Sequence, residues 1–154
     1  MVARRVVIGI GNEYRRDDGF GPWVVAELAA RRADDPRLDG VDLRVSDGEP
    51  SRMLQAWSGA DLAVLVDVAA GDRTGWCEVS LPEDAGPGGP VASGHAIGLG
   101  DTIRLARVLD RLPRRLVALV AYGREFGFGP GLSAPVAATI RPVTERICEL
   151  VAAS

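Results

Sequence analysis

The sequence predicts an α/β domain, a three-layer α/β/α sandwich around a mostly parallel central sheet of roughly five strands. Short apolar segments typical of buried strands alternate along the chain with amphipathic segments typical of helices. The chain has 154 residues and contains no linker-like stretch, so residues 1–154 are expected to form a single domain. Hydrophobic residues make up 47% of the chain and charged residues 25%, as in an ordinary globular protein.

The first two predicted elements are a strand and a helix. Residues 4–10, RRVVIGI, predict a short buried strand that ends at a glycine-containing turn. A helix is expected to begin between Asp18 and Pro22 and to run to about Arg32, because its apolar residues follow the i, i+3, i+4, i+8 spacing of one helical face. The predicted inward residues are Phe20, Trp23, Val24 and Leu28.

Four further segments lead to the middle of the sheet. Residues 41–47 alternate apolar and polar side chains, which predicts a strand with one exposed face. Residues 51–57 predict a short helix. Residues 61–69, DLAVLVDVA, are almost all apolar, which is typical of a central strand covered on both faces. A turn follows, and residues 76–80 predict another strand.

The C-terminal part contains two loops, two helices and a strand. Residues 82–94 are rich in proline and glycine and predict a loop, and residues 123–131 predict a second, flexible loop. Their glycine-rich parts, 86–94 and 123–131, either border the ligand site or are ordinary connectors. Residues 115–122 predict the last buried strand. A helix from about residue 100 to Arg111 is expected to bury one face, and so is the terminal helix, in which Pro142 predicts a kink or a later start. The residues predicted to face inward are Leu105, Val108, Leu109 and Leu112 in the first of these helices, and Val136, Ile140, Val143, Ile147 and Val151 in the second.

Chain topology indicates where a ligand would bind. Right-handed crossovers place the second strand on one side of the first. If the strand at 61–69 pairs on the other side, the strand order reverses between them, and ligands in such sheets bind at the carboxyl ends of the strands that flank the reversal. These ends are residues 11–18 and Asp67.

The turn after the first strand, GIGNEYRRDDGFG at residues 9–21, allows three interpretations. A dinucleotide fingerprint would need a third glycine where Tyr14 stands, and the carboxylates of Asp17 and Asp18 would repel a pyrophosphate. A response-regulator receiver shares the acidic pair but uses a lysine after its last strand. All 18 basic residues of this chain are arginine, so the receiver interpretation is excluded.

The third interpretation is a transition-metal site. The topology is expected to bring together Asp18, Asp67 and His95, the only histidine, and two carboxylates with one imidazole suit Ni, Zn, Mn or Fe(II). Each residue also has a simpler explanation: Asp17 is expected to cap the helix, and a solitary histidine in a glycine-rich loop is typical of a surface or capping residue. Asp67 is hardest to explain otherwise, because burying a charge without a partner is costly.

The same residues resemble the hydrogenase maturation endopeptidases, which process the large subunit of nickel–iron hydrogenases. The family pattern of G-x-G-N followed by D-[DE]-G-x-G is present at residues 9–21. A D-G-G-like turn follows as SDGEP (46–50), then a hydrophobic strand ending in aspartate as LVDVA (65–69), then SGHAIGLGDTIRLARVL (93–109) and GFGPGLSAPVAATI (127–140). The departures are Glu49 in place of a second glycine, Val68 in place of alanine, GREFG at residues 123–127, and Pro142.

The resemblance implies a metal-dependent endopeptidase that removes the C-terminal extension of a nickel–iron hydrogenase large-subunit precursor after nickel insertion. It implies that Asp18, Asp67 and His95 are both the metal-contacting and the catalytic residues, with no organic cofactor. Nickel is expected to arrive with the precursor protein, which explains why a site with only three ligands needs no metal of its own. Which of the two carboxylates acts as general base is left open by the residues.

Composition excludes several other classes of function. A net charge of -3 argues against general nucleic-acid binding, and no apolar stretch approaches the roughly 20 residues that span a bilayer, so no nucleic-acid or membrane partner is expected. Cys77 and Cys148 form no CxxC pattern, which argues against a structural zinc site and suits a cytoplasmic protein. The sequence also lacks the H-E-x-x-H motif of zinc proteases. The alternative from another class is a non-catalytic metal or small-ligand binding module on the same fold.

Overall fold

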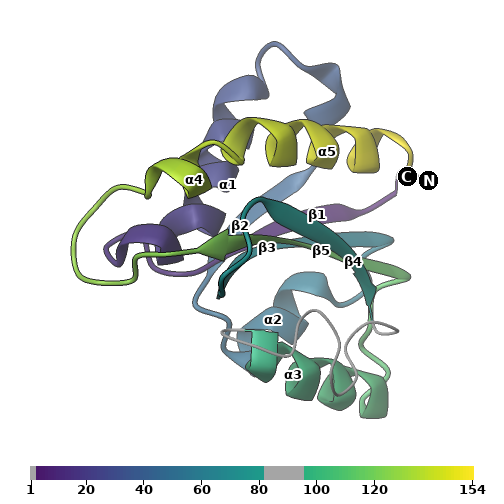
Figure 1. Ribbon diagram of the computed structural model, residues 1–154. Helices are drawn as coiled ribbons and strands as arrows, with labels where there is room; N and C mark the ends of the chain where they lie inside the picture. The colour runs from purple at the N-terminus through teal and green to yellow at the C-terminus, as the bar shows by residue number, and fades with distance from the viewer. Residues whose placement is uncertain (1–2, 82–95) are drawn as a thin grey trace.

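A computed structural model describes residues 3–81 and 96–154 of the chain. Its five-stranded sheet has the order β2-β1-β3-β5-β4 (Figure 1). The strands are β1 (Arg5–Ile10), β2 (Asp42–Ser46), β3 (Leu62–Ala70), β4 (Trp76–Leu81) and β5 (Arg115–Gly123). All neighbours pair in parallel except β4, which runs antiparallel to β5. The mostly parallel sheet is confirmed, and β1 lies between β2 and β3, as the predicted reversal of strand order requires.

Helices cover both faces of the sheet and complete the three layers (Figure 1). One face carries α1 (Phe20–Arg31), α4 (Ala134–Ala137) and α5 (Ile140–Ala152), and the other carries α2 (Pro50–Trp57) and α3 (Ala96–Val108). Side chains of β3 alternate between the two cores: Leu65 packs toward α2 and α3, and Val64 and Val66 pack toward α1 and α5. This burial on both faces explains the continuous apolar run that predicted a central strand.

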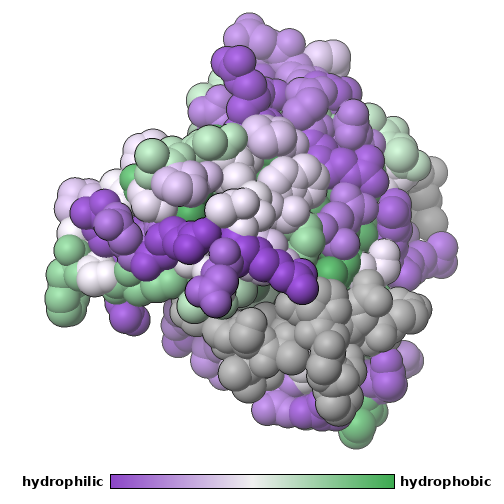
Figure 2. Space-filling view, in the orientation of Figure 1, coloured by the Kyte–Doolittle hydropathy of each residue, from purple (hydrophilic) through white to green (hydrophobic). Residues whose placement is uncertain are grey.

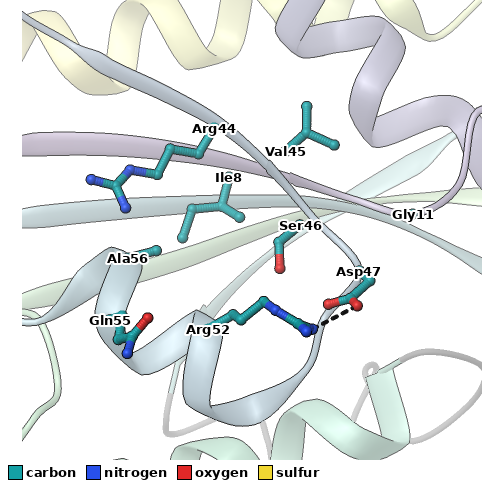
Figure 3. A pocket seen from close by; sticks show the side chains of 9 residues that line it. All are labelled: Ile8, Gly11, Arg44, Val45, Ser46, Asp47, Arg52, Gln55 and Ala56. Atoms are coloured by element: carbon teal, nitrogen blue, oxygen red, sulfur yellow. Dashed lines mark hydrogen bonds and ion pairs between the residues drawn. The ribbon is translucent and has the colours of Figure 1, made fainter.

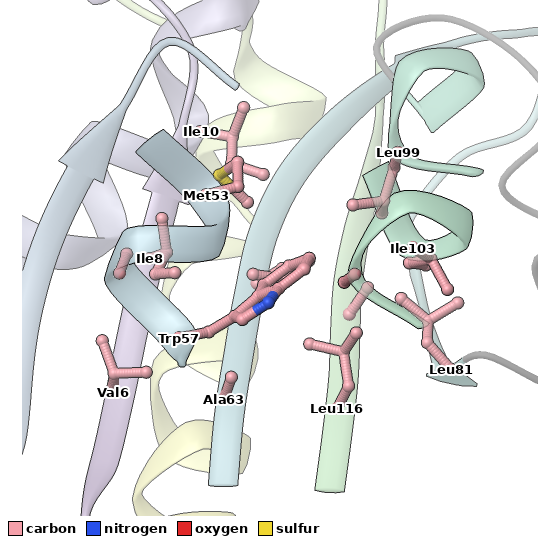
Figure 4. Packing of buried hydrophobic residues seen from close by; sticks show 14 of the residues in the cluster. Val6, Ile8, Ile10, Met53, Trp57, Ala63, Leu81, Leu99, Ile103 and Leu116 are labelled. Carbon is pink, nitrogen blue, oxygen red and sulfur yellow. The ribbon is translucent and has the colours of Figure 1, made fainter. Parts of the chain in front are cut away.

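The core between the sheet and α2/α3 is organised around Trp57. This side chain is fully buried at the end of α2 and lies against the sheet residues Ile8, Ala63 and Leu116 (Figure 4). From α3, Leu99 and Ile103 reach the same cluster. The packing fixes the position of both helices relative to the carboxyl ends of β1 and β3, where the ligand site was predicted.

Two predicted helix faces are partly wrong. Trp23 is 47% exposed, because the buried stripe of α1 runs through Phe20, Val24 and Leu28 and leaves Trp23 at its margin. Of the residues predicted to be buried by the helix at about residues 100–111, Leu105, Val108 and Leu109 are exposed, and only Leu112 packs partly against the core. Leu109 and Leu112 lie beyond α3, which ends at Val108 instead of Arg111. The helix begins at Ala96 instead of about residue 100 and buries a different stripe, formed by Leu99, Ile103 and Ala106.

The predicted effect of Pro142 is confirmed as a later helix start. The short α4 ends at Ala137, and α5 begins at Ile140, so that Pro142 lies in the first turn of α5. A first-turn N–H has no partner inside the helix, so proline is tolerated there. The loop predicted at residues 82–94 lies outside the described residues. None of the helices in the described ranges is long and apolar enough to cross a membrane.

Gly21 allows α1 to approach the sheet closely. A Cβ atom at this position would lie 2.5 Å from the backbone nitrogen of Ile10 and 2.7 Å from the carbonyl oxygen of Val66. Both atoms belong to central strands, which cannot move without breaking the sheet. The glycine therefore sets the distance between α1 and the strand ends at which Asp18 and Asp67 lie.

We expect Gly21→Ala to lower the free energy of unfolding by about 2 kcal/mol, since overpacking against fixed backbone atoms outweighs the helix propensity gained. Denaturant unfolding measures the change. The matched control is Gly127→Ala, where a Cβ atom would meet nothing within 4 Å, and a change below about 0.5 kcal/mol is expected. Equal stability of the two variants would contradict the close-approach argument.

Candidate functional site

The turn after β1 holds Asp18 through a glycine that no other residue can replace. Gly11 has a φ of 140°, and a Cβ atom there would lie 1.9 Å from the backbone oxygen of Asp18. The N–H of Asn12 donates to both the backbone oxygen and Oδ2 of Asp18, each at 3.1 Å. The Asp18 residue is only 4% exposed. The turn thus places a nearly buried carboxylate beside the carboxyl end of β1, as predicted.

Asp17 does not cap a helix, contrary to the prediction. Gly19 occupies the N-cap position of α1, and the Asp17 carboxylate is fully buried. Its Oδ2 accepts hydrogen bonds from the N–H groups of Arg124 (2.7 Å) and Glu125 (2.9 Å) and from the hydroxyl of Ser133 (2.8 Å), and its Oδ1 accepts one from the N–H of Ser133 (2.7 Å). Burial by itself raises the pKa of this carboxyl, but the four hydrogen bonds lower it more, so its pKa lies below the ordinary value.

The loop predicted to be flexible at residues 123–131 is held against the acidic turn. The N–H groups of Arg16 and Asp17 donate to the carbonyls of Gly129 (3.0 Å) and Glu125 (2.8 Å), and the N–H of Gly129 donates back to the carbonyl of Tyr14 (2.9 Å). The loop therefore supports the turn that carries Asp18. It also presents hydrophobic surface: Figure 2 shows hydrophobic side chains at the left tip of the molecule, where Figure 1 places the segment between β5 and α4.

Asp67 lies near the carboxyl end of β3 and is 5% exposed. Its Oδ1 accepts a hydrogen bond from the N–H of Val68 at 2.8 Å. The alternate residues Leu65 and Ala69 pack in the α2/α3 core, so Asp67 faces the same layer. It lines a cavity of about 90 Å³. The other lining residues are Ile10, Asp47, Gly48, Met53 and Leu99.

Asp47, which sequence reasoning did not select as a site residue, lies where three cavities meet. It lines the Asp67 cavity and also two open grooves on either side of β2. Its Oδ1 accepts from the N–H of Glu49 at 3.0 Å, and its Oδ2 pairs with Arg52 at 2.8 Å (Figure 3). The hydrogen bond from the Glu49 N–H is the main reason that the pKa of Asp47 is below its ordinary value. The signal in the sequence was the SDGEP turn, which follows a predicted strand just as the turn bearing Asp18 does.

Glu49, the departure from the family's glycine, has a local structural role. It is the N-cap of α2, and its carboxylate accepts hydrogen bonds from the N–H groups of Ser51 and Arg52, both at 3.2 Å. The hydrogen bond from the Ser51 hydroxyl, followed by those two N–H groups, lowers the pKa of Glu49. The carboxylate thus stabilises the start of α2, directly after the turn that carries Asp47.

The structure places two of the three predicted site residues at one edge of the sheet. Asp18 follows β1 and Asp67 lies in the C-terminal half of β3, and these two strands flank the reversal of strand order. His95 lies outside the described residues, although α3 begins at the next residue, Ala96, and its Leu99 shares the cavity of Asp67. Within residues 3–81 and 96–154, no three His, Cys, Asp or Glu side chains form a group that could hold a metal. The triad of Asp18, Asp67 and His95 stays a prediction.

Several solved structures share this fold. The hydrogenase maturating endopeptidase HybD from E. coli superposes with a TM-score of 0.73 at 19% identity, over 94% of this chain and 89% of that one. A [NiFe] hydrogenase maturation protease HybD from Thermococcus kodakarensis gives a TM-score of 0.74 at 22% identity, over 96% of this chain and 99% of that one. The protease HycI from the same archaeon gives 0.68 at 21%, over 97% and 92%. No protein-family model and no curated protein matches the chain. The chain shares the fold of these proteases over most of its length.

Proposed function

We propose that this chain is a hydrogenase maturation endopeptidase that removes the C-terminal extension of a nickel–iron hydrogenase large-subunit precursor after nickel has been inserted. The observation that supports it most is the pair of nearly buried carboxylates, Asp18 and Asp67, at the carboxyl edge of a sheet with the fold of such proteases. Both residues belong to sequence motifs that resemble those of this family. A shared fold alone would leave the function open, because function depends on the site.

The donor set suits a transition metal. Two carboxylates and one imidazole would hold the ion through Asp18, Asp67 and His95. A metal ion so held can polarise the scissile carbonyl or lower the pKa of a water molecule. Asp18 or Asp67, whichever is not fully engaged as a metal ligand, would accept the proton of an attacking water. Backbone N–H groups of Asn12 and Val68 orient these two side chains.

Nickel enters this proposal as part of the substrate. Three side chains leave coordination positions open, and ligands from the precursor would fill them. Cleavage then depends on nickel being already in place, because a precursor without nickel would not complete the site. The dependence links removal of the extension to successful metal insertion.

The test is to incubate the purified chain with a cognate large-subunit precursor, once loaded with nickel and once nickel-free. We expect mass spectrometry to show the shortened large subunit and the released peptide only with the loaded precursor. Failure to cleave any cognate precursor would instead support a non-catalytic binding module. Metal titration of the free chain gives a further check, since nanomolar affinity for a resident zinc ion would contradict the shared coordination.

A further inference from the structure

The strand β2 leaves one backbone edge open beside the candidate site. It is the outermost strand of the sheet and pairs with β1 alone among the described elements. The carbonyl of Ser46 accepts a hydrogen bond from the N–H of Gly11, so Ser46 directs its backbone groups toward β1. Backbone direction alternates along a strand, and the N–H and C=O of Val45 therefore point away from the sheet. An extended peptide could pair with them.

Two grooves lie on opposite sides of this edge. The groove on the α1 side has a volume of about 580 Å³ and is mainly apolar, with Pro22, Val25, Ala26 and Ala29 on α1 facing Val45 of β2. Val45 is 56% exposed although its side chain is apolar. Because Ala26 and Ala29 are small, the helix leaves room beside the strand for another apolar side chain.

The groove on the α2 side is polar. It has a volume of about 460 Å³, and Arg44, Arg52 and Gln55 provide its hydrogen-bond donors (Figure 3). Arg44 is held by Asp42 and Arg52 by Asp47, which keeps both guanidinium groups in position. Figure 3 shows Val45 on the opposite side of β2 from Ser46. An added strand would therefore direct successive side chains alternately into the apolar and the polar groove.

Both grooves lead to the candidate site. Asp47 ends the edge strand and lines the two grooves as well as the cavity of Asp67. Gly11, in the turn that holds Asp18, lines both grooves as well. A peptide that continues along β2 beyond Val45 would thus reach Asp47, which also lines the cavity of Asp67.

We propose that the C-terminal extension of the precursor binds as an additional strand along the outer edge of β2. This inference depends on the proposed function and adds the mode of substrate recognition to it. The bound segment presents an apolar side chain to the α1 groove and, at the next position, a side chain that accepts hydrogen bonds to Arg44, Arg52 or Gln55. Main-chain hydrogen bonds to Val45 supply affinity, and the two grooves supply specificity.

The decisive variant is Val45→Pro. Proline removes the outward N–H of residue 45 but none of the hydrogen bonds between β1 and β2, and an edge strand tolerates it. We expect KM for the loaded precursor to rise about three- to tenfold relative to Val45→Ala, as for one lost main-chain hydrogen bond, with kcat changed much less. Val45→Ala serves as reference because it removes the same side chain while keeping the N–H.

A second pair of variants tests the α1 groove. Ala29→Leu fills the groove, whereas Ala30→Leu adds the same side chain to an exposed position outside it. We expect the first to raise KM by about tenfold and the second to leave it unchanged, as for a pocket that loses room for one apolar side chain. Equal KM values for the two variants would overturn the assignment of this groove.

Binding can be followed without catalysis. A synthetic peptide with the sequence of the extension is titrated into 15N-labelled protein, and the amide signals of Leu43 and Val45 should shift most within β2. The proposal would be overturned if the peptide did not bind or if the shifts were confined to other elements. It would also be overturned if the protein formed a dimer in which two copies pair through β2. If the wild type cleaves the precursor but these signals and KM values do not respond, strand addition is wrong and the proposed function stands. If the peptide binds β2 but no precursor is cleaved, the proposed function fails instead.

Discussion

Replacing Asp67 by asparagine is expected to lower the rate of precursor cleavage by about 100-fold or more while the protein stays folded. Asparagine has the same shape and keeps an Oδ1 atom that can accept the 2.8 Å hydrogen bond from the Val68 N–H. It lacks the negative charge that would bind a metal ion or accept a proton. Single-turnover cleavage of nickel-loaded precursor measures the effect, with circular dichroism to verify the fold.

The matched control is Asp72→Asn. Asp72 is an exposed aspartate five positions further along the chain, just after β3 ends, so the variant removes one charge near the same edge of the sheet. We expect cleavage to continue at the wild-type rate in this variant. An Asp67→Asn protein that cleaves as fast as its control would remove Asp67 from the chemistry, and the proposed mechanism would lose one of its two carboxylates.

Replacing Asp17 by asparagine is expected to lower the free energy of unfolding by about 3 kcal/mol or more. Four hydrogen bonds converge on the buried carboxylate, and an amide cannot accept all of them because its NH₂ group would face N–H donors. The loop at residues 124–133 and the turn bearing Asp18 would separate. Denaturant unfolding measures the loss, with the exposed Asp34→Asn as control, for which less than about 0.5 kcal/mol is expected.

The loss should depend on pH in a defined direction. The pKa of Asp17 is below its ordinary value of 3.8 in the folded chain, so its ionised form stabilises the fold fully above that ordinary value. This contribution is lost as the pH falls through the lower pKa of the folded state. The difference in stability between wild type and Asp17→Asn should therefore be constant near neutral pH and shrink below about pH 4. A difference that grows on acidification would contradict the role of the charge.

Much of the architecture was predictable because it depends on local patterns. The apolar run at residues 61–69 indicated a strand buried on both faces, and β3 is that strand. Pro142 indicated a later helix start, since a missing N–H and a fixed φ act within one turn. The alternation of strands and helices, with right-handed crossovers, was sufficient to place Asp18 and Asp67 at the same edge of the sheet.

The sequence by itself indicated the fold class and selected the two carboxylates of the candidate site. The pairing of β3 on the other side of β1 was a condition of that argument, and the structure shows it. Only the tertiary structure decided that Asp17 is an anchor instead of a helix cap, because its partners lie 107 to 116 positions away along the chain. It likewise decided which stripe of α3 is buried, and that two grooves flank the open edge of β2. Periodicity and turn chemistry reflect interactions between near neighbours, whereas the partner of a buried charge and the contacts of a helix face are set by whichever distant segment packs against them.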